Sequence, residues 1–323
     1  MQSVVHLDDR TVTQLVDAAA AQRAVDDAFA AWGRGEASTT QRVRASVPHG
    51  GGMVSAMAAV VPPYCGGKIY ATSSGRFTFL NALFHADGTL LATLDGDGVT
   101  LLRTAAASAR AIRHLARPRP TVAALIGTGH QASAHVAMLV RTIPGLADVR
   151  VCGRTESAAK RVARDVPDGG ATISVHTDPT DAVAGAHVIV TVTSSREPLF
   201  PAGAVADDAL ICAVGATKSD RAEIAPDLVA RCAAVVCDDV TGSRAECGDL
   251  IRAASTGHFD WSAAIELNAV AAGTVTVPRS AVGPVLFETQ GVAIQDVAVC
   301  ALAYERHVAA ETNENPGVQE AYR

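Results

Sequence analysis

The spacing of apolar residues predicts an N-terminal region of mixed structure. Apolar positions repeat at helical spacing over Asp8–Trp32. Four later runs have the composition and alternation of strands: Val43–Val47, Met53–Val61, Gly67–Ala71 and Phe77–His85. Ala86–Thr89 predicts a hairpin turn after the last run, and Thr104–Ala116 predicts an Ala-rich helix that ends before Pro118. We expect an antiparallel or mixed sheet in this region.

The middle of the chain alternates short apolar strands with helices. The expected strands are Thr121–Ile126, Val149–Cys152, Thr172–Val175, Val188–Val192, Leu210–Val214 and Ala233–Cys237. Helices are expected over Gln131–Ile143 and Glu156–Asp165. This alternation predicts an α/β fold with a parallel, doubly wound sheet and right-handed crossovers. A further helix, Val292–Val308, could return to the N-terminal domain, and 313–323 is expected to be a loose tail.

Composition limits the class of protein. A length of 323 residues predicts two domains, for which we expect 1–117 with 290–323 and 118–289. A net charge of −6 without a Lys/Arg run argues against nucleic-acid or anionic-membrane partners. There is no apolar run of ~18 residues and no apolar stretch in Met1–Arg10, so we expect neither a membrane helix nor a signal peptide.

The cysteines and histidines give no metal signature. The seven cysteines are scattered without a CxxC pair, and His130 and His135 are not at the spacing of a helical metal pair. We therefore expect reduced thiols, a cytoplasmic protein and no metal site.

A glycine-rich turn predicts a dinucleotide site. The strand Thr121–Ile126 leads directly into Gly127–Ala132, which has the pattern GxGxxA, and a helix follows. In this pattern the first glycine permits the tight turn and the second lets the pyrophosphate approach the backbone, while the small Ala132 lets helix and strand pack closely. The helix N-terminus adds unpaired N–H groups and a partial positive charge for the phosphates.

The end of the next strand indicates which dinucleotide binds. NAD-binding proteins usually carry an acidic residue there for the ribose 2′-hydroxyl. Here Cys152 and Gly153 are followed by Arg154 and Thr155, which could bind a 2′-phosphate, with Lys160 and Arg161 adding positive charge. We expect NADP(H) to be preferred and NAD(H) to be possible.

Two segments together resemble the ornithine cyclodeaminase/mu-crystallin family: Leu101–Ala109 and Ile126–Ala132. The resemblance implies a homodimer with a Rossmann dinucleotide domain over 118–289. It also implies a discontinuous α+β domain, 1–117 with 290–323, for substrate binding and dimerisation. The substrate would be an imino or amino acid. The residues matching the family's substrate site are Arg44, Lys68, Thr78 and Arg103, with Arg42 an alternative to Arg44 in the alignment.

Two acidic positions of the family differ in this chain. Thr217 stands where cyclodeaminases carry an Asp that moves protons, and Ser55 stands at a second acidic position. Threonine is not a general base near neutral pH without activation, so the full cyclodeaminase cycle is disfavoured. Reduction of a ketimine needs mainly positioning of the substrate. Cys237–Leu250 also resembles the family's reductases of pyrroline-2-carboxylate and piperideine-2-carboxylate.

We therefore expect NAD(P)H-dependent reduction of a cyclic 2-imino acid to proline or pipecolate, with Lys68 and Thr217 as catalytic residues. The expected cofactor residues are Thr104, Gly127, Thr128, Gly129, His130, Gln131, Arg154, Thr155, Thr193, Ser194, Val214, Gly215 and Asp296. For Asp296, a place on the helix surface is equally open. Three alternatives remain: an NAD-dependent ornithine cyclodeaminase, an alanine dehydrogenase-like enzyme acting on a linear imino acid, and a non-catalytic NADPH-dependent ligand-binding protein.

Overall fold

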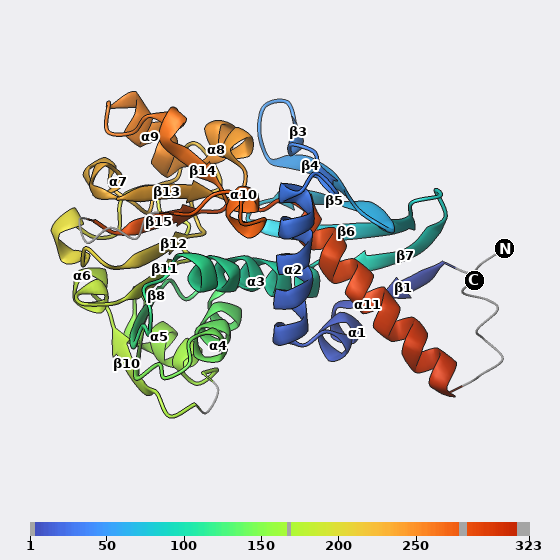
Figure 1. The fold of residues 1–323 in the computed structure, drawn as a ribbon, viewed down its shortest axis with the longest axis horizontal. Coiled ribbons are helices and arrows are strands. Elements are labelled where there is room, and N and C mark those ends of the chain that lie inside the picture. Colours follow the sequence, from blue (N-terminus) through green and yellow to red (C-terminus); the bar gives the residue numbers. More distant parts are fainter. Residues whose placement is uncertain (1–3, 167–168, 278–282, 315–323) are drawn as a thin grey trace. The chain divides into compact units, whose positions relative to one another are not determined.

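The computed structural model describes residues 4–166, 169–277 and 283–314 and divides the chain into two compact units (Figure 1). Unit 1 consists of Met1–Ala106 with Gly291–Arg323, and unit 2 is Ala107–Gln290. The expected domains have the same order and the same discontinuity. Their first boundary, at 117, lies just beyond helix α3 (Asp97–Leu115), whereas the structural division falls within that helix.

Unit 1 is built around one mixed sheet. Its strands are β1 (Val5–Leu7), β2 (Ser38–Thr39), β3 (Val43–Ser46), β4 (Gly52–Val61), β5 (Tyr64–Ser73), β6 (Arg76–His85) and β7 (Leu90–Asp95). They lie in the order β1-β7-β6-β5-β4-β2, and β3 also pairs with β4. All pairs are antiparallel except β1 with β7. The C-terminal helix α11 (Ala293–Glu314) packs on β4, β5 and β6 and against α2 (Ala18–Gly33) (Figure 1).

The two faces of this sheet differ in burial. Side chains alternate between faces along a strand, so Met57, Lys68 and Leu83 share the face that is buried under α11. The opposite face, which we call the open face, carries apolar side chains that remain exposed. They include Val54, Val60, Ile69 and Leu80, which are 40–48% exposed.

The N-terminal helix was predicted wrongly as one element. The structure has two helices, α1 (Asp9–Leu15) and α2, because the Asp17 carboxylate accepts a hydrogen bond from the Ala20 N–H and so begins a new helix. The four strand-like runs and the hairpin turn are confirmed, the turn by a bond from the Thr89 N–H to Asp87. Strands β1, β2 and β7 were missed, and α3 begins seven residues earlier than expected, at position 97 instead of 104.

Unit 2 contains a fully parallel sheet, which confirms the doubly wound α/β prediction. Its strands are β8 (Val122–Ile126), β9 (Asp148–Cys152), β10 (Thr172–His176), β11 (Val188–Thr191), β12 (Leu210–Ala213), β13 (Ala234–Cys237), β14 (Ala264–Glu266) and β15 (Val285–Glu288). Their order is β10-β9-β8-β11-β12-β15-β13-β14. The sequence did not indicate β14 and β15 as strands.

The helices of unit 2 cover this sheet. They are α4 (Ala132–Thr142), α5 (Glu156–Ala163), α6 (Pro179–Val183), α7 (Pro226–Arg231), α8 (Val240–Glu246), α9 (Gly248–Ser255) and α10 (Leu267–Ala271). The core includes Ile189 and Ile211 from the strands, packed with Leu228 of α7 and Leu250 of α9. All four residues of β11 and of β12 are buried, as expected for central parallel strands.

The topology of unit 2 indicates where a ligand would bind. From β8 the chain proceeds to β9 and β10 on one side and then returns to β11 on the other. The carboxyl ends of β8 and β11 therefore form the topological switch point, where parallel α/β sheets hold their ligands.

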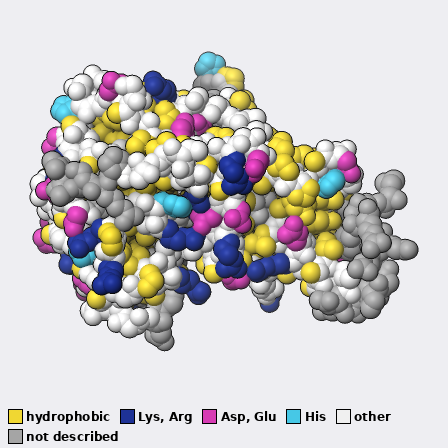
Figure 2. Space-filling view, viewed as in Figure 1, with side chains coloured by type: hydrophobic (Ala, Val, Ile, Leu, Met, Phe, Trp, Pro, Cys, Tyr) yellow, Lys and Arg dark blue, Asp and Glu magenta, His cyan; other side chains and the backbone are white. Residues whose placement is uncertain are grey.

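No helix in the described part of the chain has the length and apolar character needed to cross a membrane. On the face seen in Figure 2, basic side chains are interspersed with acidic ones. That face therefore presents no continuous basic surface of the kind that binds nucleic acid.

Candidate active site

The glycine-rich turn has the predicted strand–turn–helix context. Gly127 adopts φ 122°, and a Cβ there would lie 2.8 Å from the Val192 carbonyl oxygen, so only glycine fits. A Cβ on Gly129 would meet nothing within 4 Å, which leaves its backbone open to a ligand. Helix α4 begins at the fully buried Ala132. The backbone N–H groups at this helix start suit a phosphate.

A cavity of about 570 Å³ lies at the carboxyl ends of β8, β9 and β11. It is lined by Gly127, Thr128, Gly129, Arg154, Arg161, Thr193, Ser194 and neighbouring residues. The charged side chains in this lining are Arg154 and Arg161, and no carboxylate is among them. The lining therefore lacks the acidic group that would bind a ribose 2′-hydroxyl and offers two cations instead.

The four polar residues expected at the adenosine end have different surroundings. Thr155 caps helix α5, because its hydroxyl accepts from the Ala158 N–H at 3.3 Å. Lys160 forms an ion pair with Glu156 at 2.6 Å, away from the cavity lining. Arg154 is exposed at the cavity, and the Arg161 guanidinium donates to the Thr128 carbonyl at 3.4 Å. Arg154 and Arg161 are thus the two cations available to a 2′-phosphate.

The loops after β11 and β12 carry the other expected cofactor residues. Thr193 and Gly215 both donate backbone N–H groups to the carboxylate of Glu223, and Val214 donates to the Thr191 carbonyl. The Thr217 N–H donates to the Gly215 carbonyl at 2.9 Å. The sequence analysis did not single out Glu223. It is the one acidic residue of the segment 222–224, whose three residues are fully buried.

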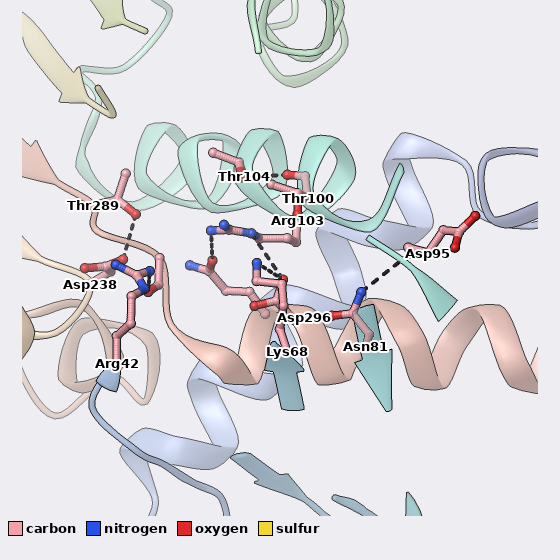
Figure 3. A network of polar contacts seen from close by, with 12 residues as sticks. Arg42, Lys68, Asn81, Asp95, Thr100, Arg103, Thr104, Asp238, Thr289 and Asp296 are labelled. Carbon is pink, nitrogen blue, oxygen red and sulfur yellow. Dashed lines mark hydrogen bonds and ion pairs between the residues drawn. The ribbon is translucent and has the colours of Figure 1, made fainter. Parts of the chain in front are cut away.

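In unit 1, two expected substrate residues meet around one carboxylate (Figure 3). Lys68 of β5 donates to Asp296 of α11, with Nζ and Oδ1 2.7 Å apart. Arg103 of α3 lies with Nε 3.4 Å from the same oxygen and donates through Nη1 to Gln295 at 2.8 Å. We call Lys68, Arg103, Gln295 and Asp296 the cation cluster. The cluster contains two cations and one carboxylate and therefore has a net charge of one positive unit.

The ammonium of Lys68 is almost completely buried. Burial lowers its pKa to about 8, Asp296 opposes that change, and the nearby cations Arg103 and Arg42 reinforce it. The rings of Tyr70 and Phe79 lie 5.9 and 5.5 Å from Nζ and stabilise the cation further. Lys68 therefore carries its charge near neutral pH and loses it in mildly alkaline solution.

Both arginines that compete for the third cationic position lie on unit 1. Arg42 donates to the Gly291 carbonyl at 2.9 Å, directly before α11. Gly291 has φ 80°, and a Cβ there would clash with the guanidinium of Arg103. Arg44 is exposed on β3 opposite Ser55, which places it on the same face of the sheet as Lys68. Both arginines therefore stay candidates for the substrate carboxylate.

Thr78 is separated from the cation cluster by the sheet itself. It pairs with Ala71 on β5, so its side chain is on the open face, whereas Lys68 pairs with Asn81 on the buried face. The structure thus does not bring Thr78 to Lys68 within unit 1. Thr104 is buried on α3, and its hydroxyl donates to the Thr100 carbonyl at 2.6 Å.

The position of Asp296 corrects one expectation. Its side chain is only 1% exposed, so the possibility of a place on the helix surface is wrong. Sequence reasoning missed its ion pair and the role of Gln295. A signal was present, because Gln295 and Asp296 are adjacent polar residues in a helix that is otherwise apolar at its start.

Several buried polar atoms near Lys68 have no hydrogen-bond partner among the described residues. They are Oδ2 of Asp296, Nε2 of Gln295, Oδ1 of Asn81 and Oγ of Ser55. A buried polar atom without a partner costs about 1–3 kcal/mol, so such groups mark a place where a ligand or water binds. In contrast, the described residues include no group of three or more His, Cys, Asp or Glu side chains arranged for a metal ion.

Comparison with known proteins gives a consistent result. The model of the ornithine cyclodeaminase/mu-crystallin family matches residues 2–311. The Delta(1)-pyrroline-2-carboxylate reductase 1 of Burkholderia multivorans is 37% identical over 73% of this chain and 73% of its own length. A Delta(1)-pyrroline-2-carboxylate/Delta(1)-piperideine-2-carboxylate reductase of Azospirillum brasilense is 34% identical over 85% of this chain and 87% of its own. The structure of an archaeal alanine dehydrogenase dimer with bound NAD has a TM-score of 0.89 and 28% identity, covering 95% of this chain and 97% of that one.

Proposed function

This chain belongs to the ornithine cyclodeaminase/mu-crystallin family, and we propose that it reduces a cyclic 2-imino acid to the corresponding L-amino acid with a nicotinamide dinucleotide. The substrate would be delta-1-pyrroline-2-carboxylate or delta-1-piperideine-2-carboxylate, and the product proline or pipecolate. The observation that carries this proposal is the cation cluster, in which Lys68 and Arg103 retain one excess positive charge. Two relatives with these substrates in their names support it.

The cation cluster suits a 2-imino acid. Arg103 and Lys68 would bind the carboxylate, since guanidinium and ammonium groups form charge-assisted hydrogen bonds with it. The Gln295 Nε2 group is a further donor for the carboxylate, and Oδ2 of Asp296 can accept from the N–H of a protonated imine. Arg42 or Arg44 would contribute the third cation. These contacts fix the imine carbon in one position, which is the main requirement for the reaction.

The residues at two positions of the chain favour reduction over deamination. Thr217 and Ser55 occupy the two positions where cyclodeaminases have acids, and neither hydroxyl is a base near neutral pH. A protonated imine needs no base before it accepts hydride. Thr217 would therefore orient the substrate or a water molecule rather than remove a proton.

The cavity of unit 2 fits a dinucleotide, because Gly129 leaves room for a ligand at the start of α4. When bound, the reduced nicotinamide supplies the hydride. We propose NADP(H) as the preferred cofactor and NAD(H) as a second one, since Arg154 and Arg161 are the charged groups of the lining. The other proposed cofactor residues are Thr104, Gly127, Thr128, His130, Gln131, Thr155, Thr193, Ser194, Val214 and Gly215.

We propose a homodimer formed through the open face of the unit 1 sheet. Beyond the four side chains already named, this face carries Ala56, Ala58, Ala82 and Phe84, and a cavity of about 520 Å³ with a mainly apolar lining. A continuous exposed apolar face of this kind marks an interaction site. A second copy is the proposed occupant, because the structurally similar alanine dehydrogenase is a dimer.

The first prediction tests the reaction. Purified protein given either imine with NADPH should consume the reduced nicotinamide and form proline or pipecolate. Replacing Lys68 with Met should lower kcat/KM by about 100-fold, as expected when one partner of a buried charged contact is removed. The exposed Arg23→Met variant is the control. Ammonia release from ornithine without imine reduction would instead identify a cyclodeaminase, and saturable ligand binding without turnover would identify a binding protein.

The second prediction concerns pH. Pyrrole-2-carboxylate carries the carboxylate but no nitrogen that titrates near neutral pH, so its inhibition constant reports on the cation cluster. This inhibitor should bind more weakly as the pH rises through about 8, where Lys68 loses its charge. Asp296→Asn should move the midpoint of this loss of binding to lower pH, because Lys68 loses the carboxylate that favours its charged form. Arg103 and Arg42, which lower the pKa of Lys68, and the neighbouring thiol of Cys300 are unchanged in this variant.

The exposed Asp27→Asn variant is the control for this pH profile and should leave the midpoint unchanged. An identical midpoint in Asp296→Asn and the wild type would contradict the assignment of the titration to Lys68.

The third prediction concerns the cofactor. Arg154→Ala should weaken NADPH binding about tenfold and NADH binding less than about twofold. Only NADPH carries the adenosine 2′-phosphate, which loses a charge-assisted hydrogen-bond partner in this variant. Quenching or transfer of protein fluorescence on titration measures both affinities. Arg164→Ala, an exposed arginine outside the cavity lining, serves as the control. Equal losses for the two dinucleotides would disprove the 2′-phosphate site.

The fourth prediction concerns the dimer. Ile69→Lys places a charge in the centre of the open face and should convert the protein to a monomer in light scattering after size exclusion. Val275→Lys changes an exposed apolar residue of unit 2, which is 38% exposed, and should leave the dimer intact. A wild type that is monomeric at micromolar concentration, or an Ile69→Lys variant that stays dimeric, would contradict the proposed interface.

A further inference from the structure

Glu223 is a fully buried carboxylate in unit 2 that the proposed reaction does not use. Its Oε1 accepts from the backbone N–H and the hydroxyl of Thr193, each at 2.6 Å. Its Oε2 accepts from the hydroxyl of Thr191 at 2.8 Å and from the Gly215 N–H at 2.7 Å. Burial raises the pKa of Glu223, and these four hydrogen bonds act in the opposite direction.

The four donors belong to two strand ends. Thr191 ends β11 and Thr193 follows it in the cavity lining, whereas Gly215 follows β12. A Cβ on Gly215 would clash with the Thr193 carbonyl, so the two chain segments approach as closely as backbones can. Glu223 thus joins the loop after β11 to the loop after β12 through a single side chain.

A second buried carboxylate holds Glu223 in place. Asp249 of α9 accepts from the backbone N–H groups of Glu223 and Ile224, at 2.7 and 2.9 Å. The Leu199 N–H donates to the Glu223 carbonyl at 2.9 Å, which ties the same residue to the far end of the loop after β11. The position of Glu223 is therefore fixed by the buried Asp249 of helix α9 and by the backbone of Leu199, not by solvent-exposed side chains.

Only a carboxylate satisfies this arrangement. Each oxygen faces one backbone N–H, which can donate but never accept. A glutamine of nearly the same shape would turn its NH2 group toward one of these N–H groups and leave two donors facing each other. The loss would therefore fall on the position of Thr193 or Gly215.

We propose that Glu223 is a positioning residue that sets the loops after β11 and β12 for the ribose–nicotinamide half of the dinucleotide. This inference rests on the proposed function, because Thr193 and Gly215 are proposed cofactor residues. It adds a residue that does not itself contact the cofactor. The adenosine half would lie at Arg154, which follows β9, and at Arg161, in the last turn of α5, and Glu223 holds neither segment.

The test compares two ligands on Glu223→Gln. NADPH contains both halves, whereas adenosine 2′,5′-bisphosphate contains only the adenosine half. The variant should bind NADPH about tenfold more weakly or worse and the bisphosphate within about twofold of the wild type, since an unsatisfied buried donor lowers affinity by about that factor. With imine as substrate, kcat should fall more than the KM for the imine rises.

Glu197→Gln is the matched control, because Glu197 lies in the same loop but is exposed and pairs with Arg252 at 3.3 Å. It should bind both ligands as the wild type does. Equal losses of NADPH and bisphosphate in Glu223→Gln would show general damage to unit 2 and would overturn the inference, as would unchanged NADPH affinity.

Thr191→Val keeps the test decisive if Glu223→Gln does not fold. It removes one of the four hydrogen bonds and retains the shape of a buried side chain. NADPH should bind a few-fold more weakly with the bisphosphate unchanged, and no change in either would overturn the inference. Binding is measured without turnover, so a wild type inactive on imines would disprove the proposed function and leave the role of Glu223 to be decided separately.

Discussion

A buried ammonium group organises unit 1. Lys68 lies on the covered face of an antiparallel sheet, and a buried charge without a partner costs several kcal/mol. Its partner, Asp296, is 228 residues away in the sequence, on the C-terminal helix. The need to neutralise Lys68 therefore ties α11 to β5, and through Arg103 to α3. This ion pair is one of the contacts that join α11 to the N-terminal part of unit 1, beside its packing on α2, β4 and β5, and the cation cluster retains one excess positive charge for an anionic ligand.

Unit 2 also contains a buried charged group that needs partners, here a carboxylate instead of an ammonium group. The carboxylate of Glu223 is buried and is satisfied by four donors from two neighbouring strand ends. In both units a buried charge connects segments that the sheets bring together, and in both it lies beside residues proposed to bind a ligand. Buried charges at strand ends thus help to define the positions of the residues proposed to bind ligands.

The sequence patterns predicted those features that depend on residues close together in the chain. Strand, turn and helix follow one another within Thr121–Thr142, so the dinucleotide turn was evident from the sequence. Relations across a sheet were not evident, because a face is defined only once strands are in register. Thr78 therefore falls on the open face, away from Lys68. The break between α1 and α2 depends on one capping bond of Asp17, which apolar periodicity does not contain.

The surroundings of the two proposed binding regions agree on the role of the cofactor. The family resemblance implies acids of cyclodeaminases at the positions of Thr217 and Ser55, and neither hydroxyl is a base near neutral pH. A reductase consumes one dinucleotide in each turnover, so its cofactor has to enter and leave. Arg154 is exposed at the cavity, where the 2′-phosphate of the proposed cofactor would bind without burial of the charge. An exposed cation contributes modest affinity, which favours exchange over permanent retention of the cofactor. The absent acids and the exposed arginine thus favour the same chemistry, in which the dinucleotide is a hydride donor used once and replaced.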